Sequence, residues 1–433
     1  MNRETTAILI LMVTFVFFIV CRFPIAFGIG ISTLLTCLYL ELPLMQVAQL
    51  MVKGVNVFSL MAVPFFILAG ELMGSGGISK RLIALSNALI GWMRGGLAMV
   101  NIIASVFFGG ISGSSTADTA SLGTILIPMM KDEGYDEDFS TCVTMASSVQ
   151  GLLIPPSHNM VLYATVAGSV SVGRLFLAGY VPGIVLAIVL MIYSYIISVK
   201  RKYPKGDPFN IKNVLKTCWD SIWGLLTVLI VVIGVVFGMF TATESAAIAV
   251  VYALIVSLFV YRELDLKGIW HVLERGLNTL AIVLILISTS TAFGWMLTYL
   301  KMPELVANAI LGVSDNKYVI MLIMNVLLLV LGCVMDMSAL ILVCTPILLP
   351  IATGIGVDPV HFGAIMILNL GIGLITPPVG GTLFVGSAVS GIKIEKLSKA
   401  MLPFYAMMVI ALMIVTFCPG LVMFLPNLMM PVM

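Results

Sequence analysis

Two stretches, Gly151-Leu-Leu-Ile-Pro155-Pro156 and Gly373-Leu-Ile-Thr-Pro377-Pro378, place a pair of prolines inside apolar sequence. The surrounding residues, 139–173 and 359–392, contain no Asp, Glu, Lys or Arg. A proline removes a backbone donor and clashes with the preceding turn, so two in succession end a helix. In hydrocarbon, the carbonyls that lose their partners are tolerated only where they are buried in protein or line a cavity. Paired, interrupted membrane segments of this kind predict the binding site of a secondary transporter.

The composition indicates a polytopic membrane protein. Hydrophobic residues make up 61% of the 433 residues and charged residues only 10%, which is too little polar surface for a soluble domain. Long uncharged runs favour α-helical spans over the alternating strands of a membrane barrel. The seven cysteines are scattered singly, so we expect neither a structural metal site nor a disulfide framework. We expect no organic cofactor and no nucleic-acid partner.

The apolar runs predict the membrane topology. Two apolar stretches, 95–130 and 318–355, are interrupted in the middle by small or acidic residues and are predicted to be re-entrant hairpins. Residues 78–94 and 262–275 are expected to be interfacial helices. Because basic residues mark cytoplasmic loops, the cluster over residues 200–216 predicts that both termini are periplasmic. The expected crossings are residues 5–21, 24–41, 55–74, 139–167, 175–199, 219–240, 244–261, 277–300, 360–390 and 400–425.

The two proline pairs belong to an internal repeat. A constant shift of 222 residues (377 − 155) also aligns other special backbone residues, namely Gly110 with Gly332, Pro128 with Pro350, Gly134 with Gly356, Asp136 with Asp358 and Gly151 with Gly373. Lys131 marks the start of the first broken span as cytoplasmic, whereas Lys393 marks the end of the second. The copies are therefore predicted to run in opposite directions, as an inverted repeat that supports alternating access.

The first hairpin is predicted to turn within residues 109–118, which are rich in glycines and hydroxyl side chains. Hydroxyl and freed carbonyl oxygens suit Na⁺, while exposed helix N-termini favour a carboxylate. Small-residue helix packing is the alternative interpretation. The first predicted Na⁺ site consists of Ser112, Gly113, Ser114, Gly151 and Pro155.

The second hairpin is predicted to turn near residues 332–339 and to face the second proline pair. Its tip is less polar, so backbone carbonyls would supply more of the ion's ligands. The second predicted Na⁺ site consists of Gly332, Met335, Asp336, Thr376 and Val379.

Four carboxylates interrupt the apolar segments: Glu71, Asp118, Glu244 and Asp336. A charge inside a membrane is expensive and indicates function by default. Asp336 is the best candidate for ion or substrate contact. Asp118 has two interpretations: it belongs to an ion site, or it caps the second helix of its hairpin. Glu71 and Glu244 are expected to join scaffold helices or to face a partner. For His158 two interpretations are equally supported. It contacts the substrate, or its hydrogen bonds are satisfied within the protein at a polar helix break.

Several motifs resemble one family when they are taken together. They are residues 64–71, 112–118, 127–135, 240–244 and 373–378, and they resemble the large membrane subunit of tripartite ATP-independent periplasmic (TRAP) transporters over essentially the whole chain. Ala242 departs from the family, which usually has proline there. The resemblance implies an elevator-type, Na⁺-coupled importer of organic acids in the bacterial inner membrane. It also implies two partners, a small four-helix membrane subunit on a separate chain and a periplasmic substrate-binding protein.

The resemblance makes the hairpin serines and Asp336 candidates for substrate contact, and the residues after the first proline pair bear on which acid is carried. The predicted substrate-binding residues are Ser112, Ser114, Ser115, Ser157, Asn159 and Asp336. The expected division of the chain is scaffold with an interfacial arm (1–94), first transport repeat (95–170), scaffold with a second arm (171–300), second transport repeat (301–392) and C-terminal scaffold helix (393–433).

Other functions remain possible from the sequence alone. A proton-coupled transporter or an ion channel could share this architecture. An intramembrane serine hydrolase could use Ser112, in Gly110-Ile111-Ser112-Gly113, with His158 as its base. The hydrolase interpretation leaves the paired helix breaks unexplained, so we expect no enzyme. No phosphate-binding G-x-x-x-x-G-K-[S/T] loop occurs, which excludes an ATPase of that class.

Overall fold

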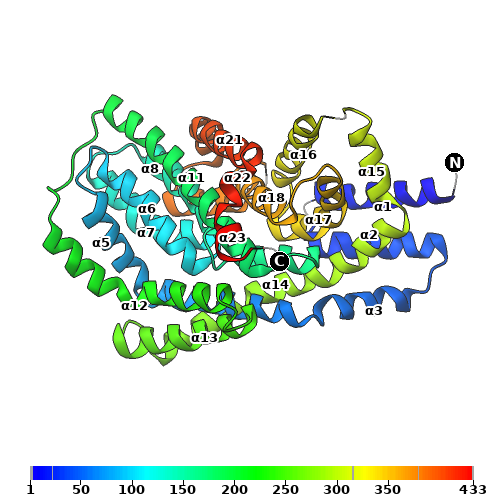
Figure 1. Cartoon of the computed structure of the whole chain (residues 1–433), viewed down its shortest axis with the longest axis horizontal. Helices are drawn as coiled ribbons and strands as arrows, with labels where there is room; N and C mark the ends of the chain where they lie inside the picture. Colours follow the sequence, from blue (N-terminus) through cyan, green and yellow to red (C-terminus); the bar gives the residue numbers. More distant parts are fainter. Residues whose placement is uncertain (1–2, 22, 315, 379, 432–433) are drawn as a thin grey trace.

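The computed structural model describes residues 3–21, 23–314, 316–378 and 380–431, and α-helices form almost all of its regular structure (Figure 1). Among the described residues, six helices are long and apolar enough to cross a membrane, or up to eight if each of two bent helix pairs counts as one span. The predicted all-helical, polytopic class is therefore confirmed.

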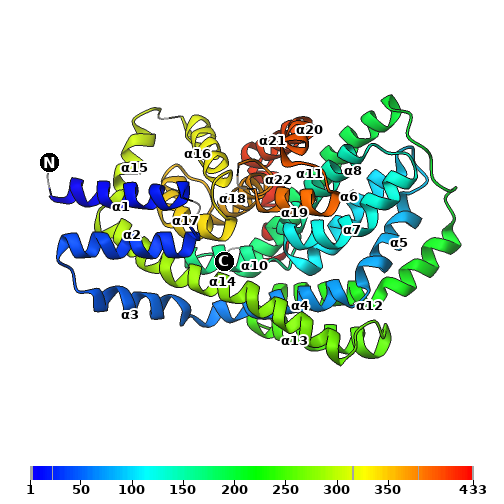
Figure 2. The ribbon, with the colours of Figure 1, turned by 180° about the vertical axis from the view of Figure 1, so that it is seen from behind.

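A layer of packed helices runs along the longest axis of the molecule (Figure 2). Helix α14 packs against α2, α3 and α4, while α13 packs against α4 and α12. The helices of this layer are α1 (Arg3–Val20), α2 (Ile25–Leu40), α3 (Leu44–Val55), α4 (Ala62–Ser75), α5 (Ile78–Ile90), α12 (Ile211–Val236), α13 (Ala242–Ile255) and α14 (Leu266–Tyr299), with the short turns η1 (Phe58–Met61) and η2 (Val256–Val260).

The central group of helices contains two helix–turn–helix hairpins and two broken segments. The first hairpin is α6 (Gly96–Ser112) and α7 (Ser115–Asp132), followed by α8 (Glu137–Ser148), α9 (Gln150–Leu153) and α10 (His158–Ala167). The second is α16 (Lys317–Gly332) and α17 (Met337–Gly354), followed by α18 (Pro359–Gly373) and α19 (Gly381–Ser390). Both breaks fall at the predicted proline pairs, and both Pro-Pro bonds are cis.

The remaining helices lie beside these hairpins. Helix α11 packs on α6, α9 and α18, and α21 packs on α11 and α18. They are α11 (Val172–Lys200), α15 (Met302–Leu311), α20 (Ile394–Ala400), α21 (Leu402–Phe417), α22 (Pro419–Val422) and α23 (Phe424–Met429).

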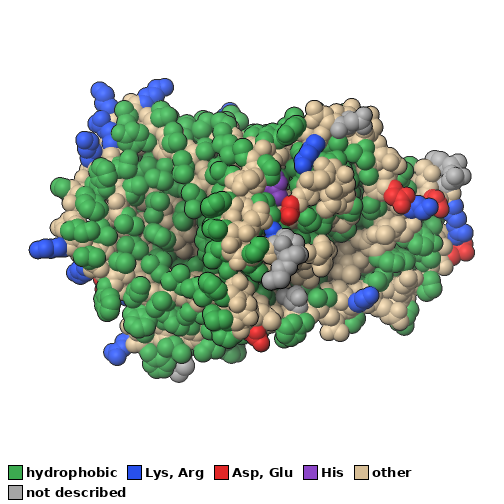
Figure 3. Space-filling model, in the orientation of Figure 1, with side chains coloured by type: hydrophobic (Ala, Val, Ile, Leu, Met, Phe, Trp, Pro, Cys, Tyr) green, Lys and Arg blue, Asp and Glu red, His purple; other side chains and the backbone are tan. Residues whose placement is uncertain are grey.

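The surface is that of a protein surrounded by lipid. Figure 3 shows apolar side chains over most of the visible face, with Lys and Arg gathered at the left end and further charged side chains at the right end. Helix α1 buries only Ala7, Leu11 and Phe15, which are spaced four residues apart. Phe15 packs on Phe293 of α14 with ring centroids 5.3 Å apart. The rest of its apolar surface faces outward, which requires lipid or another protein.

Two predicted elements are wrong in their boundaries. The expected interfacial helix over residues 262–275 is not separate, because α14 runs unbroken from Leu266. Asp265 caps its start by accepting a hydrogen bond from Gly268 N at 2.7 Å, and no proline follows to interrupt the helix. The expected crossing over residues 55–74 is divided, because α3 ends at Val55 and α4 begins at Ala62.

Candidate functional site

Each hairpin touches its own broken segment through a pair of glycines. A Cβ on Gly151 would lie 3.1 Å from the Cα of Gly109, and a Cβ on Gly332 would lie 3.1 Å from the Cα of Gly373. Such approaches are possible only where neither backbone carries a side chain. The 222-residue shift aligns Gly151 with Gly373 (151 + 222 = 373). It aligns Gly332 with Gly110, the neighbour of Gly109, so the two contacts correspond to within one residue.

The first predicted Na⁺ site is gathered at the tip of the first hairpin. Gly113 ends α6 with a φ of +60°, and a Cβ there would lie 3.0 Å from the carbonyl oxygen of Pro156. A Cβ on Gly110 would lie 3.1 Å from the carbonyl oxygen of Pro155. These carbonyls are not used in a continuing helix, because the proline pair interrupts it. The tip therefore faces the freed carbonyls of the first break, as the sequence predicts.

The hairpin serines are held by hydrogen bonds within the turn and to the end of α8. Ser114 caps α7, and its Oγ accepts a hydrogen bond from Ala117 N at 3.4 Å. Ser112 Oγ accepts from Ser114 N at 3.3 Å. Ser115 Oγ lies 2.6 Å from Ser148 Oγ at the end of α8. Hydroxyls fixed in this way present oxygen lone pairs in a defined direction, which suits a cation, whereas a free O–H donor suits an anion.

The two units are joined through their hairpin tips. Ser115 Oγ of the first hairpin lies 3.1 Å from Thr382 Oγ1 in α19, beyond the second break. Ser338 Oγ of the second hairpin lies 3.4 Å from Asn159 Oδ1 in α10, beyond the first break. Each tip thus contacts the helix that follows the other unit's break, so the hydroxyl and amide groups of both units meet in one place.

A cavity of about 420 Å³ lies at this meeting point. Helices α4 and α14 close one side of it through residues such as Glu71 and Thr279. Five of the six predicted substrate residues line it, together with His158: Ser112, Ser114, Ser115, Asn159 and Asp336. The sixth, Ser157, is fully buried beside Gly113 and does not line the cavity.

The second predicted Na⁺ site is less complete. Gly332 contacts Gly373, and Met335 is buried at the hairpin turn. The Thr376 hydroxyl, in the break after α18, donates to Ile372 O in the last turn of that helix at 2.7 Å. Asp336 caps α17, where its Oδ1 accepts from Ser338 N at 2.9 Å. Val379 lies outside the described residues.

Asp118 is completely buried close to the first break. It does not cap α7, because Ser114 occupies that position. Ser105 Oγ donates to its Oδ1 at 3.5 Å, but Oδ2 has no hydrogen-bond partner among the described residues. Oδ2 would lie 3.7 Å from a Cβ on Gly151. Since an unpaired buried carboxylate is costly, this geometry favours the ion-site interpretation of Asp118 over the cap.

A polar chain behind Asp118 was missed by sequence reasoning. Ser105 Oγ lies 3.0 Å from Ser147 Oγ, whose hydroxyl also reaches Asn101 Oδ1 at 3.3 Å. Asn101 Nδ2 donates to Thr144 Oγ1 at 2.6 Å. The sequence does contain a signal for this chain. Polar residues 101 and 105 are four apart on one face of a helix, and polar residues 144 and 147 are three apart on one face of another.

The other two carboxylates have different partners. Glu71 Oε2 lies 3.4 Å from Arg275 Nε, so this residue joins α4 to α14, as expected. Glu244 instead caps its own helix, α13, in a capping box with Thr241. Arg275 brings a basic side chain to Glu71 from a distant part of the sequence.

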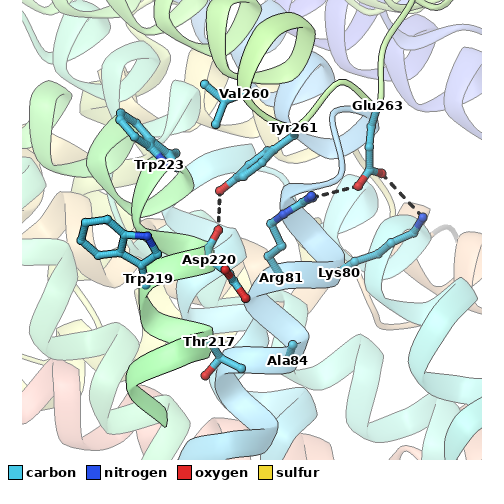
Figure 4. A pocket seen from close by; sticks show the side chains of 10 residues that line it. All are labelled: Lys80, Arg81, Ala84, Thr217, Trp219, Asp220, Trp223, Val260, Tyr261 and Glu263. Carbon is cyan, nitrogen blue, oxygen red and sulfur yellow. Dashed lines mark hydrogen bonds and ion pairs between the residues drawn. The ribbon is translucent and has the colours of Figure 1, made fainter. Parts of the chain in front are cut away.

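A larger cavity, of about 580 Å³, lies between α5, α12 and the end of η2. Figure 4 shows Lys80 and Arg81 directed toward Glu263, and the Tyr261 hydroxyl directed toward the backbone of Asp220. Arg81 Nη1 lies 2.8 Å from Glu263 Oε1, and Lys80 Nζ lies 3.6 Å from its Oε2. Because its cations are already paired and no hairpin tip or helix break lines it, this cavity is not the candidate site.

The family model described as "Tripartite ATP-independent periplasmic transporter, DctM component" matches residues 12–421. "Uncharacterized protein YgiK" of Salmonella typhimurium is 41% identical over 98% of both chains. "Sialic acid TRAP transporter large permease protein SiaM" of Vibrio cholerae is 40% identical over 88% of this chain and 89% of that protein. "Isethionate TRAP transporter permease protein DctMQ" of Oleidesulfovibrio alaskensis is 42% identical over 95% of this chain, which spans 65% of that protein.

Solved structures share the fold at low sequence identity. The YdaH transporter of Alcanivorax borkumensis matches with a TM-score of 0.62 at 15% identity, over 87% of this chain and 89% of that chain. MtrF of Neisseria gonorrhoeae matches with a TM-score of 0.61 at 15% identity, over 87% of this chain and 83% of that chain. At this identity the likeness establishes the architecture alone.

Proposed function

Since the chain belongs to the family of TRAP transporters, as the DctM component or large permease, we propose that it imports a small organic acid by Na⁺-coupled secondary transport. The family consists of transporter permeases, so the chain is not an enzyme. Its relatives are named for sialic acid, C4-dicarboxylates and isethionate. Each of these acids carries a carboxylate or a sulfonate, so the proposed substrate is a small organic anion.

The observation that carries this proposal is the convergence of three helix N-termini on the 420 Å³ cavity. First-turn residues of α7, α10 and α17 line it, including Ser115, Asn159 and Ser338. Each N-terminus presents the positive end of a helix dipole, which favours an anion. One first-turn N–H of α7 is bonded to Ser114 Oγ and one of α17 to Asp336 Oδ1, so the proposal relies on the remaining first-turn N–H groups. Hydroxyl and amide side chains would orient the acid group.

Two sodium ions are proposed to accompany the acid. The first is assigned to the tip of the first hairpin, where Ser112, Gly113, Ser114, Gly151 and Pro155 supply oxygens or permit close approach. Asp118 extends this assignment, because its unpaired Oδ2 would supply a negative charge close to the ion. The second is assigned to the turn of the second hairpin, with Gly332, Met335, Asp336, Thr376 and Val379 as the proposed residues.

The proposed transport cycle is an elevator movement of an inverted repeat. The contacts between Ser115 and Thr382 and between Ser338 and Asn159 support a single rigid unit, because each links the two halves at the cavity. Helices α11 and α21 pack on this unit, and Arg201 after α11 is bonded to Asp136 before α8. We therefore include α11 and α21 in the moving unit, although the sequence assigned residues 171–300 and 393–433 to the scaffold.

The protein is a multi-pass membrane protein, and the inner membrane of a bacterium is its proposed location, with periplasmic termini. A small membrane subunit on a separate chain and a periplasmic binding protein are its proposed partners. The exposed apolar surface of α1 and α12 supports a membrane partner as well as lipid, because it includes Phe17, Trp219 and Leu229.

Reconstitution tests this function directly. The chain would be placed in proteoliposomes with its small subunit, and the periplasmic binding protein would be added outside with radiolabelled succinate, isethionate or sialic acid. We expect uptake that requires an inward Na⁺ gradient and stops when choline replaces Na⁺. Because each net positive charge gains ~2.3 kcal/mol per 100 mV, uptake should rise with an inside-negative potential if charge enters. Uptake driven by a pH gradient in choline would instead indicate proton coupling.

A further inference from the structure

A second cavity adjoins the proposed substrate site. It has a volume of about 310 Å³ and lies between α4, α6, α7 and α14. It shares Gly70, Glu71 and Ala117 with the 420 Å³ cavity, so the two cavities border each other at these residues, and together they are called the path. Away from the hairpin tip, the path is lined by Gly74, Ser75, Ser121 and Arg275, among others.

Helical periodicity explains why Arg275 faces this path. Residues 275, 279, 282, 283 and 286 of α14 are spaced by three or four and form one face of the helix. The last four of them line the 420 Å³ cavity, and Arg275 lines the second one. It is the single Lys or Arg among the described residues that line either cavity.

In the proposed topology, the second cavity lies on the cytoplasmic side of the substrate site. Arg275 lies near the start of α14, after the basic residues Arg262 and Lys267, and such clusters mark cytoplasmic loops. On the opposite wall, α4 continues past a 69° bend into α5, which carries Lys80 and Arg81. An acid that leaves the hairpin tips toward the cytoplasm therefore passes Glu71 and Arg275.

Arg275 is bound loosely enough to accept a further anion. Its Nε lies 3.4 Å from Glu71 Oε2, and its Nη2 donates to Ser75 Oγ at 2.7 Å. A guanidinium has five N–H donors in a fork that matches a carboxylate, so these two contacts leave donors available. The Arg275 side chain is 58% exposed, whereas that of Glu71 is 27% exposed. A solute in the cavity can therefore reach the guanidinium.

We propose that Arg275 is a second, transient binding site for the acid group of the transported anion on its way to the cytoplasm, and that Glu71 neutralises it between passages. This inference rests on the proposed function. Without Arg275, the Glu71 carboxylate would repel the departing anion. Without Glu71, an unpaired Arg275 would hold the anion too long. The Arg275 guanidinium exchanges the Glu71 carboxylate for the acid group of the substrate and back again, so it is never left without an anion.

A purely structural role makes a different prediction. If the ion pair only fastens α4 to α14, removing either charge weakens the same contact, and both variants change in the same direction. A relay site predicts opposite changes, because the two residues act on the anion with opposite sign. This difference separates the two explanations.

The test uses the complete system in proteoliposomes loaded with increasing concentrations of succinate, isethionate or sialic acid, whichever the wild type imports. Binding protein added only outside restricts the signal to correctly oriented transporters. The measured quantity is the internal concentration of the acid that halves uptake, compared among Arg275→Gln, Glu71→Gln, Arg275→Lys and the control Lys267→Gln. Lys267 carries the same charge on the same helix, is exposed and lines neither cavity.

We expect Arg275→Gln to raise this concentration about tenfold, the size of one charge-assisted hydrogen bond, and Glu71→Gln to lower it. Arg275→Lys and Lys267→Gln should stay near the wild type, and the Na⁺ concentration for half-maximal uptake should not change. Equal or same-direction shifts for Arg275→Gln and Glu71→Gln would overturn the inference while leaving Na⁺-dependent uptake intact. Wild-type vesicles that import none of these acids would contradict the proposed function itself, and the inference with it.

Discussion

A Cβ on Gly373 would lie 2.6 Å from the Cα of Gly332, so the second broken helix touches the second hairpin backbone to backbone. The carbonyl oxygen of Gly332 would be 2.8 Å from the same Cβ. Neither backbone can move away freely, because α18 is buried along its length and Gly332 ends α16. The contact holds the second hairpin against the second proline pair.

Gly373→Ala should therefore destabilise the protein by about 1–3 kcal/mol or more, the usual cost of overpacking a close contact. The matched control is Gly354→Ala at the end of α17, where a Cβ would meet no atom within 4 Å. Thermal unfolding of the purified complex, followed by tryptophan fluorescence, measures the effect. Equal unfolding temperatures for the two variants would show that this backbone contact is not tight in solution.

Asp118→Asn should raise the Na⁺ concentration needed for half-maximal uptake by about tenfold, because it removes a charge from the proposed first ion site. Asp132→Asn, an exposed position on the same helix, is the control. If no cation binds there, neutralising a buried, unpaired carboxylate should instead stabilise the protein and leave the Na⁺ dependence unchanged. Uptake measured over a range of Na⁺ concentrations, with thermal unfolding alongside, distinguishes these results.

The sequence predicts the features of the site that depend on nearby residues. Proline pairs end helices locally, so both breaks appear where they were expected. Glycines and serines in residues 109–118 form the expected turn, and Gly113 has the positive φ that such a turn requires. The binding roles of these residues stay predictions, because geometry alone does not identify an ion.

The features that the sequence could not supply depend on distant residues. Ser115 and Thr382 are 267 positions apart, and Ser338 and Asn159 are 179 apart. No local pattern links such pairs, since their contact depends on how the two units pack together. Arg275 was missed for a related reason. Its position on the cavity face follows only once α14 is known to continue without a break from Leu266.

Asp136 should make a stability contribution that is lost in acid. Its Oδ2 accepts hydrogen bonds from Tyr203 Oη at 2.7 Å and from Arg201 Nη1 at 2.5 Å. These bonds, chiefly that from Tyr203, hold the pKa of Asp136 below its usual value. A carboxylate with a lowered pKa in the folded state stabilises the protein above its unfolded pKa of about 4, and this contribution disappears as the pH falls through the folded pKa.

Asp136→Asn should therefore lower the unfolding temperature at pH 7 but have little effect near pH 3. Because the Asp136 side chain is 54% exposed, the loss at pH 7 should be no more than about 1 kcal/mol, or a shift of about 2–4 °C. Unfolding curves of wild type and variant between pH 7 and pH 3 measure it. A difference that persists at the lowest pH would assign the effect to lost packing instead of lost charge.

Gly70→Ala should slow transport more than it destabilises the protein. Gly70 lies on the face of α4 that borders the substrate cavity, and a Cβ there would lie 3.2 Å from both the Cα and the carbonyl oxygen of Ser112. In the proposed elevator movement the first hairpin slides past this face, so a methyl group would obstruct its tip. We expect uptake to fall about tenfold, equivalent to ~1.4 kcal/mol in the barrier.

Gly74→Ala provides the matched control, because it adds the same methyl group one turn further along α4. There a Cβ would lie 3.6 Å from Ser121 Oγ and 3.7 Å from Phe108 Cζ, which are ordinary contacts with side chains. Initial rates of Na⁺-driven uptake at equal protein content compare the two variants. Gly74→Ala should transport at nearly the wild-type rate. If Gly70→Ala also transported at nearly the wild-type rate, the hairpin tip would not need to pass close to α4. The interface between the moving unit and the rest of the protein would then lie elsewhere.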